Sequence, residues 1–567
     1  MSTEAALLRA IRDMPDEDTP RLVYADYLDE DGYSPRAEFI RVQIERSQLP
    51  ERDPRRVPLE DRAHDLLAEH ERAWLGVAPD DVDGLTEWEF DRGFVHEVAA
   101  SPVFMRTAGT DLCAAHPVRR WRVQSGEGDT VADLRDAGQR GWFSRLEALD
   151  LSGCYADLGE LGGFLAHSNF DRLRELDLTD RGPLEPLPEL LEFAPFRDRL
   201  KVLRCGDEGA GVGGRLDAQE LVRALGNRCR LEELAVTWAV MTADDLRDLL
   251  AADVCSQLAS LHLHANHIAP DGWAAFRAAR CRLIELDLSH SPLGAISLDR
   301  VLDCASLSDL RRLHVSGCGS AMANVRALAG SRFWAQADEL RMRDGSVPEA
   351  SLDPLFATAG PPALRVLDVA GNWVRDAGVA RLCNAPWAGA LEYLDLSQND
   401  LSDDALRTIA ASGRFKNLRT LHLNFNSVYH QEGADRNESI TDAGLRALAD
   451  CPDLANLRVL SVSGTRITAA GVDAVLNAPH WRLTGLMLAQ CQLRPDVVGV
   501  LASSPRLARL EVLDLSGNDE IDLDDLGPLA ESEYLSPQTE LDIRGIGGRR
   551  PSALYPFRLR LGHRLSE

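Results

Sequence analysis

Apolar residues recur along most of this chain in a six-residue pattern, Leu-x-x-Leu-x-Leu, at intervals of about 27 residues. Its copies begin at Leu146, Leu173, Leu200, Leu231, Leu258, Leu283, Leu310, Ala337, Leu364, Leu391, Leu418, Leu457, Leu483 and Leu510. Each copy predicts a short strand followed by a helix, as after Thr441, which can cap a helix start. The expected fold is therefore an α/β horseshoe solenoid with parallel strands on its concave face and helices on its convex face.

The ends of this array show weaker versions of the pattern. Residues 118–123 fit a degenerate first copy and residues 541–543 a degenerate last one, as expected of caps over an exposed core. Residues 87–90 and 94–96 predict a hairpin in front of the array. Residues 557–561 alternate between apolar and polar side chains, which predicts a strand in the rear cap.

Eight positions three residues beyond the last leucine of a copy carry Asn or Cys. They are Cys154, Asn266, Cys318, Asn372, Asn399, Asn426, Cys491 and Asn518. In this repeat type such side chains hydrogen-bond the backbone of neighbouring loops, so these cysteines are predicted to be structural. The chain has eleven cysteines and no Cys-x-x-Cys pair, which favours packing over a disulfide framework or a zinc site.

On these residues, the chain over about 118–545 resembles the ribonuclease-inhibitor-like and cysteine-containing leucine-rich-repeat families. That resemblance implies a non-catalytic binder, an inhibitor, a substrate adaptor or a GTPase activator, and the fold alone does not choose among them.

A second resemblance lies near the N-terminus, in Thr19-Pro20-Arg21-Leu22-Val23-Tyr24-Ala25-Asp26-Tyr27-Leu28 and Arg36-Ala37-Glu38-Phe39-Ile40-Arg41. These residues are similar to the bacterial repeat-companion domain, which has no established activity to transfer. Helices are expected over 4–13, 21–30 and 35–49. The predicted organisation is a helical companion domain over 1–50, a linker helix and capping hairpin over 51–117, repeats over 118–545 and a cap over 546–567.

Charge narrows the possible partners. A formal charge of −28 argues against general binding of nucleic acid or of an anionic membrane. The N-terminus lacks a signal-peptide pattern, and no apolar run is long enough to span a bilayer, so a cytoplasmic location is expected.

The sequence contains no convincing catalytic motif, so neither an enzyme activity nor a cofactor is expected. Residues 209–214, Gly-Ala-Gly-Val-Gly-Gly, match a dinucleotide fingerprint, but the repeat continues on both sides, which favours a glycine-rich insertion. The sequence has no phosphate loop, no His-Glu-x-x-His and no nucleophile elbow.

The candidate binding surface is the concave face, where residues flanking the second leucine point to solvent. The predicted partner-binding residues are His262, His264, Asp287, His314, Arg341, Arg343, Asp368, Asp395, His422 and Tyr429. Tyr429 begins a polar insertion over 429–438, which either grips a partner at the rim or is a tolerated loop. A metal site formed by His262, His264 and Asp287 is conceivable, although solvated or ion-paired imidazoles are the commoner case.

Histidine titration and internal pairing give two further expectations for this face. His262, His264 and His314, with ordinary pKa values near 6.5, are expected to gain charge between about pH 7 and 6 and to attract an acidic partner segment. Alternatively, Glu285 and Glu339, beside Arg312, neutralise the patch internally. The leading hypothesis is a non-catalytic scaffold that binds another protein. The alternatives are a regulator of a partner enzyme, either an inhibitor or a GTPase activator, and a structural spacer.

Overall fold

The computed structural model divides the chain into two compact units, residues 1–268 with 278–281, and residues 269–277 with 282–567. It describes residues 3–566 except 31, 33, 51–52, 54, 78–83, 127–129, 208–213, 267, 292–297, 319–320, 358–359, 362, 427–438, 548–553 and 562–563. The glycine-rich segment and the insertion at 429–438 thus lie wholly or mostly outside the described residues. The domain boundaries expected at residues 50, 117 and 545 stay predictions.

The first unit begins with helices that match the expected ones closely: α1 (Thr3–Asp13), α2 (Asp18–Glu30), α3 (Ser34–Gln48) and α4 (Arg56–Trp74). Strands β1 (Leu85–Asp91) and β2 (Phe94–Ala100) form an antiparallel hairpin where the sequence pattern predicts one. Ile11, Ala25, Ile40 and Phe94 share one buried cluster, so the helices pack on the hairpin.

The repeats of the first unit add one parallel strand after another to β2. The strands are β3 (Arg120–Gln124), β4 (Ala148–Gly153), β5 (Glu175–Thr179), β6 (Val202–Gly206), β7 (Glu233–Thr237) and β8 (Ser260–His262). The helices are α5 (Pro102–Thr107), α6 (Gly109–Ala115), α7 (Val131–Gly138), α8 (Leu158–His167), α9 (Leu187–Glu192), α10 (Ala218–Leu225) and α11 (Ala243–Ala251). Capping boxes at Thr130, Asp157 and Thr242 fix three of the helix starts.

The second unit continues the same repeat. Its strands are β9 (Glu285–Asp287), β10 (Arg312–His314), β11 (Glu339–Arg341), β12 (Val366–Asp368), β13 (Tyr393–Asp395), β14 (Thr420–His422), β15 (Val459–Ser461), β16 (Gly485–Met487), β17 (Val512–Asp514), β18 (Glu540–Asp542) and β19 (Leu565–Ser566). Each pairs in parallel with the next along the chain.

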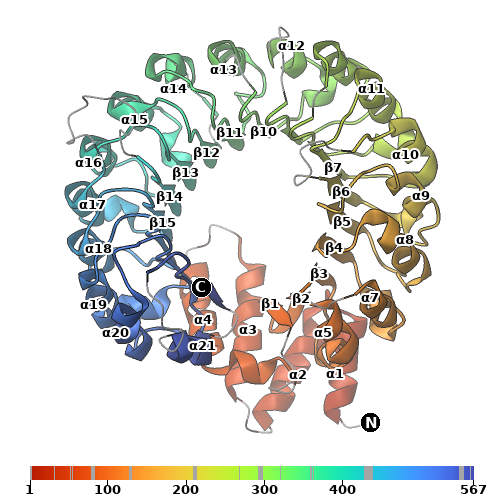
Figure 1. Ribbon diagram of the computed structural model, residues 1–567, viewed down its shortest axis with the longest axis horizontal. Coiled ribbons are helices and arrows are strands. Elements are labelled where there is room, and N and C mark those ends of the chain that lie inside the picture. The colour runs from red at the N-terminus through yellow and green to blue at the C-terminus, as the bar shows by residue number, and fades with distance from the viewer. Residues whose placement is uncertain are drawn as a thin grey trace. The chain divides into compact units, whose positions relative to one another are not determined.

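Its helices lie on the other side of the leucine core from the strands (Figure 1). They are α12 (Leu298–Leu302), α13 (Ala321–Gly330), α14 (Asp353–Phe356), α15 (Arg375–Asn384), α16 (Asp403–Ser412), α17 (Asp442–Ala449), α18 (Ala469–Leu476), α19 (Asp496–Ser503), α20 (Gly527–Glu531) and α21 (Tyr555–Leu561). Leucines of the repeat, such as Leu394 and Leu421, are fully buried. The fold is an α/β solenoid, as expected.

The rear cap differs from the expectation. Residues 557–561 were expected to form a strand, and they form the end of helix α21 instead. The Phe-Arg-Leu-Arg-Leu pattern also places Phe557 and Leu561 four residues apart, on one helix face, and both are buried. Arg560 supports this arrangement by donating to the carbonyl of Ser532 at 2.7 Å.

No helix in the described part of the chain has the length and apolar character that a membrane crossing requires.

Candidate functional site

The strand residues predicted for binding in the second unit stand in one register. Asp287, His314, Arg341, Asp368 and Asp395 pair successively across β9 to β13, and His422 follows on β14. Identical register places these side chains on the same face of neighbouring strands, about 4.8 Å apart. We call these six residues, with Glu339 and Arg343, the charge row.

His314 is the most enclosed cation of the charge row. Its Nε2 lies 3.0 Å from Glu339 Oε1 and its Nδ1 lies 3.8 Å from Asp287 Oδ2. Burial alone would lower the pKa of His314, but its contacts with Asp287 and Glu339 outweigh burial and raise the pKa to about 9. The expectation that His314 gains charge between pH 7 and 6 is therefore wrong, because His314 is already charged in that range.

The pKa values of the two carboxylates beside His314 are lowered by the same contacts. Burial tends to raise the pKa of Asp287, but His314, the Ser289 hydroxyl and the Ser289 amide stabilise the anion and bring the pKa to about 2. For Glu339, His314 and Arg341 likewise outweigh burial and lower the pKa to about 2. All three groups are thus ionised together near neutral pH.

Further along the row, two aspartates are enclosed beneath arginine. Arg343 Nη1 lies 3.3 Å from Asp368 Oδ2 and 3.5 Å from Asp395 Oδ2. Burial, followed by the neighbouring Asp395, raises the pKa of Asp368. His422 Nδ1 lies 3.6 Å from Asp395 and 3.3 Å from the Tyr393 hydroxyl. Many cations of this face are therefore paired with carboxylates of the same face, as in the expected alternative in which the patch is neutralised internally.

The aspartates also have a local structural role. Asp287, Asp368 and Asp395 each accept a hydrogen bond from the backbone amide two residues later, at 2.8, 3.1 and 2.9 Å. Asp150 and Asp514 do the same at 2.8 and 2.9 Å. The recurrence indicates that aspartate at this position fixes the turn after the strand, so its presence alone is not a binding signal.

The remaining predicted residues fall elsewhere. His262 and His264 belong to the first unit, where the His264 ring lies 6.0 Å from that of Trp238. Tyr429 lies outside the described residues. Sequence reasoning missed Tyr393, whose ring lies 5.4 Å from the Arg341 guanidinium. The available signal was an aromatic residue one strand position before the second leucine, two strands along the sheet from the strand that carries Arg341.

Sequence reasoning also missed a second ion-pair network, on the strand face of the first unit. Arg120 binds both carboxylate oxygens of Glu175 at 3.1 and 2.8 Å, and Arg122 contacts Glu87 at 2.9 Å and Asp150 at 3.2 Å. With Arg204, these arginines line a polar hollow of about 140 Å³. Every pair joins different strands, so the network holds the sheet together as well as covering it.

A family model described as a leucine-rich repeat matches residues 362–383 and 391–410, in the part of the second unit that carries the charge row. The chain contains leucine-rich repeats. Proteins of this class generally mediate protein–protein interactions. The narrower ribonuclease-inhibitor-like and repeat-companion resemblances stay predictions.

Curated relatives are similar to this chain over a limited stretch. Leucine-rich repeat-containing protein 14 is 35% identical over 135 residues in Homo sapiens, and 34% identical over 135 residues in Rattus norvegicus. Each match covers 23% of this chain and 26% of the relative. The chain thus spans about a quarter of the length of the curated relatives it matches.

Two solved structures show a distant likeness. An internalin from Listeria monocytogenes aligns with 75% of this chain and 94% of its own at 16% identity and a TM-score of 0.29. The yeast Rad7 and Elc1 complex aligns with 82% and 94% at 12% identity and a TM-score of 0.37. Both scores are low, so the fold rests on the family match and the observed strand pairing.

Proposed function

We propose that this protein is a non-catalytic scaffold that binds another protein through the strand face of its second unit. The observation that carries the proposal is the difference in exposure between cations and anions in that face. The side chains of Arg312, Arg341 and Arg343 are 40%, 36% and 43% exposed, whereas those of Asp368 and Asp395 are 0% and 2% exposed. A partner therefore meets guanidinium groups, although the underlying row is close to charge-balanced.

Partly buried carboxylates orient two of these arginines in advance. Glu285 holds Arg312 through two contacts of 3.0 and 2.8 Å, and Glu339 holds Arg341 through its Nε. A guanidinium group has five N–H donors, so each arginine keeps donors beyond those in these contacts. Because the side chains are already ordered, a partner loses less conformational entropy by binding them.

The partner chemistry that fits this surface is a segment rich in hydrogen-bond acceptors, above all carboxylates. Arginine forks bind carboxylates with two parallel hydrogen bonds. The buried anions reduce the net attraction, so the charges should contribute more to orientation and specificity than to affinity. The sequence also leads us to expect an acidic partner segment, and here the exposed arginines are the groups that would bind it.

The test compares two double variants of equal charge change. Arg341→Ala with Arg343→Ala removes the face arginines, and Arg407→Ala with Arg494→Ala removes exposed arginines on the helix side and the loop preceding α19. Each is used as bait in native lysate, and captured proteins are quantified by mass spectrometry at two salt concentrations. The proposal predicts a protein that the wild type and the control capture, and that the face variant loses by roughly tenfold, about 1.4 kcal/mol.

Higher salt should weaken the capture as well. Equal capture by the face variant and the wild type would contradict the proposed surface. No enriched protein with any bait would contradict the scaffold function and favour a structural spacer. A captured enzyme whose turnover changes on binding would favour a regulator.

A further inference from the structure

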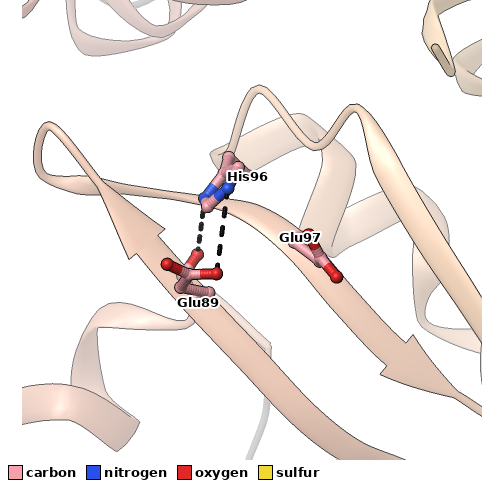
Figure 2. Close-up of side chains that lie close together, drawn as sticks. All are labelled: Glu89, His96 and Glu97. Atoms are coloured by element: carbon pink, nitrogen blue, oxygen red, sulfur yellow. Dashed lines mark hydrogen bonds and ion pairs between the residues drawn. The ribbon is translucent and has the colours of Figure 1, made fainter. Parts of the chain in front are cut away.

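The hairpin of the first unit contains an irregularity that moves one histidine side chain. Glu89 pairs with Glu97 and Phe90 pairs with Val95, so His96 is an extra residue on strand β2. Neighbouring residues of a regular strand point to opposite faces. A bulge breaks this rule and redirects a side chain, and bulges are common beside functional sites. His96 consequently points toward Glu89 on the facing strand (Figure 2).

The bulge brings three possible metal ligands together. One ligand atom from each of Glu89, His96 and Glu97 lies within 4.8 Å of the others. Glu89 and Glu97 are direct cross-strand partners, and like charges in that position destabilise a hairpin. A bound cation would convert this repulsion into attraction.

The imidazole of His96 is held in a way that suits metal binding. Its Nδ1 lies 3.2 Å from the Glu89 carbonyl oxygen, and its Nε2 lies 4.0 Å from Glu89 Oε2. Histidines that bind metals usually donate their second ring N–H to a carbonyl or a carboxylate. With the proton on Nδ1, the lone pair of Nε2 is directed to the side where the Glu89 carboxylate lies.

We propose that this hairpin binds a divalent transition-metal ion, Zn²⁺ in the first place, through His96 Nε2 and the carboxylates of Glu89 and Glu97. One imidazole and two carboxylates form a nitrogen and oxygen ligand set that suits Zn²⁺, and three protein ligands leave a coordination position for water or for a partner. The Glu89 side chain is 70% exposed and can rotate to shorten the ligand spacing.

Two arginines compete with the metal for Glu97. Arg120 Nε lies 3.1 Å from Glu97 and Arg122 Nη2 lies 3.6 Å from it. Arg120 also binds Glu175, and Arg122 also binds Glu87 and Asp150, so both stay paired when Glu97 turns to a metal. The nearby positive charges nevertheless make this site weaker than a structural zinc site of thiolates.

The experiment is calorimetric titration of the full chain with ZnCl₂. The variants are His96→Ala and the nearly isosteric Glu89→Gln, and the matched control is His167→Ala, whose exposed ring contacts the Gly163 carbonyl at 2.9 Å. The chain has 14 histidines, so the hairpin site is identified by the difference between variants. We expect His96→Ala and Glu89→Gln each to weaken one binding event tenfold or more, and His167→Ala to leave it unchanged.

Cobalt(II) gives an independent readout. The wild type should show visible absorption bands of a coordinated Co²⁺ ion that His96→Ala and Glu89→Gln reduce, while circular dichroism confirms that both variants are folded. If both variants bind Zn²⁺ and Co²⁺ as the wild type does, the three residues are an ordinary surface group and the proposal is wrong.

Discussion

At the scale of single residues, His314 shows how one side chain can join three strands. It lies on β10, between Asp287 on β9 and Glu339 on β11, and its side chain is 17% exposed. Because each partner is on a different strand, its contacts connect successive repeats of the second unit. An unpaired charge left in such a position is costly, so the three groups should stabilise the fold as a set.

The pH dependence of His314 is the first prediction. A folded pKa of about 9 lies above the ordinary value of 6.5, so the stabilisation by His314 is complete below about pH 6.5 and is lost as pH rises through about 9. The pKa values of Asp287 and Glu339, near 2, give stabilisation that is present above their ordinary values and is lost as pH falls toward 2. NMR titration of the His314 ring should show a midpoint near 9, and a midpoint near 6.5 would refute the ion-pair arrangement.

Removal of the imidazole is the second prediction. His314→Ala should lower the free energy of unfolding by about 2 kcal/mol at pH 6, because Asp287 and Glu339 lose their shared cation. The exposed His480 provides the control, and His480→Ala should change the urea midpoint little. Equal midpoints for the two variants would show that His314 is not structurally coupled to its neighbours.

At the scale of the repeat element, buried asparagines connect one loop to the next. Asn399 Nδ2 donates to the Val369 carbonyl at 2.9 Å, and its Oδ1 accepts from the Val374 amide at 3.1 Å. Asn426 similarly donates to Leu396 and accepts from Leu401. Cys318 Sγ contacts the Leu288 carbonyl at 3.0 Å, so cysteine takes a weaker version of the same role.

The third prediction concerns Asn399, one of the buried asparagines that connect successive loops, which together we call the asparagine ladder. Asn399→Ala should lower the free energy of unfolding by about 2–3 kcal/mol, because the buried Val374 amide loses its acceptor and the Val369 carbonyl keeps only the bond from Asn372. Asn384→Ala on the exposed side of α15 is the matched control and should have little effect. Denaturant unfolding followed by circular dichroism measures both, and an equally small change for Asn399→Ala would contradict the ladder.

The repeat could be predicted because it is periodic in sequence, and features that do not follow from this period could not be predicted. The leucine spacing gave the strands, and the Asn and Cys positions gave the ladder, because both follow directly from the repeat. The segment at 557–561 satisfies a strand pattern and a helical pattern equally, so only packing of Phe557 and Leu561 decides between them. The raised pKa of His314 depends on how its side chain meets Glu339, which spacing does not fix.

At the scale of the whole molecule, each unit is stabilised by contacts between neighbouring repeats, so an interior repeat requires a cover. Truncation after Asn399 removes β14 and α16, the neighbours of β13 and α15. Leu394 and Leu396, now fully buried, would then lie at an uncapped end. We predict an aggregated or partly unfolded product. Size-exclusion chromatography with light scattering tests this, and a monomer that unfolds cooperatively would oppose it.

The central claim is that a partner protein binds the strand face of the second unit, and site-specific photo-crosslinking tests it most directly. A crosslinking amino acid replaces Val366, half-buried on β12 beside the charge row, or Ala377, exposed on α15 in the same repeat. Both full-length proteins are irradiated in native lysate. The account predicts a specific crosslinked protein from position 366 that acidic competitor peptide or high salt suppresses, and no such product from position 377. A partner crosslinked from position 377 and not from position 366 would contradict it.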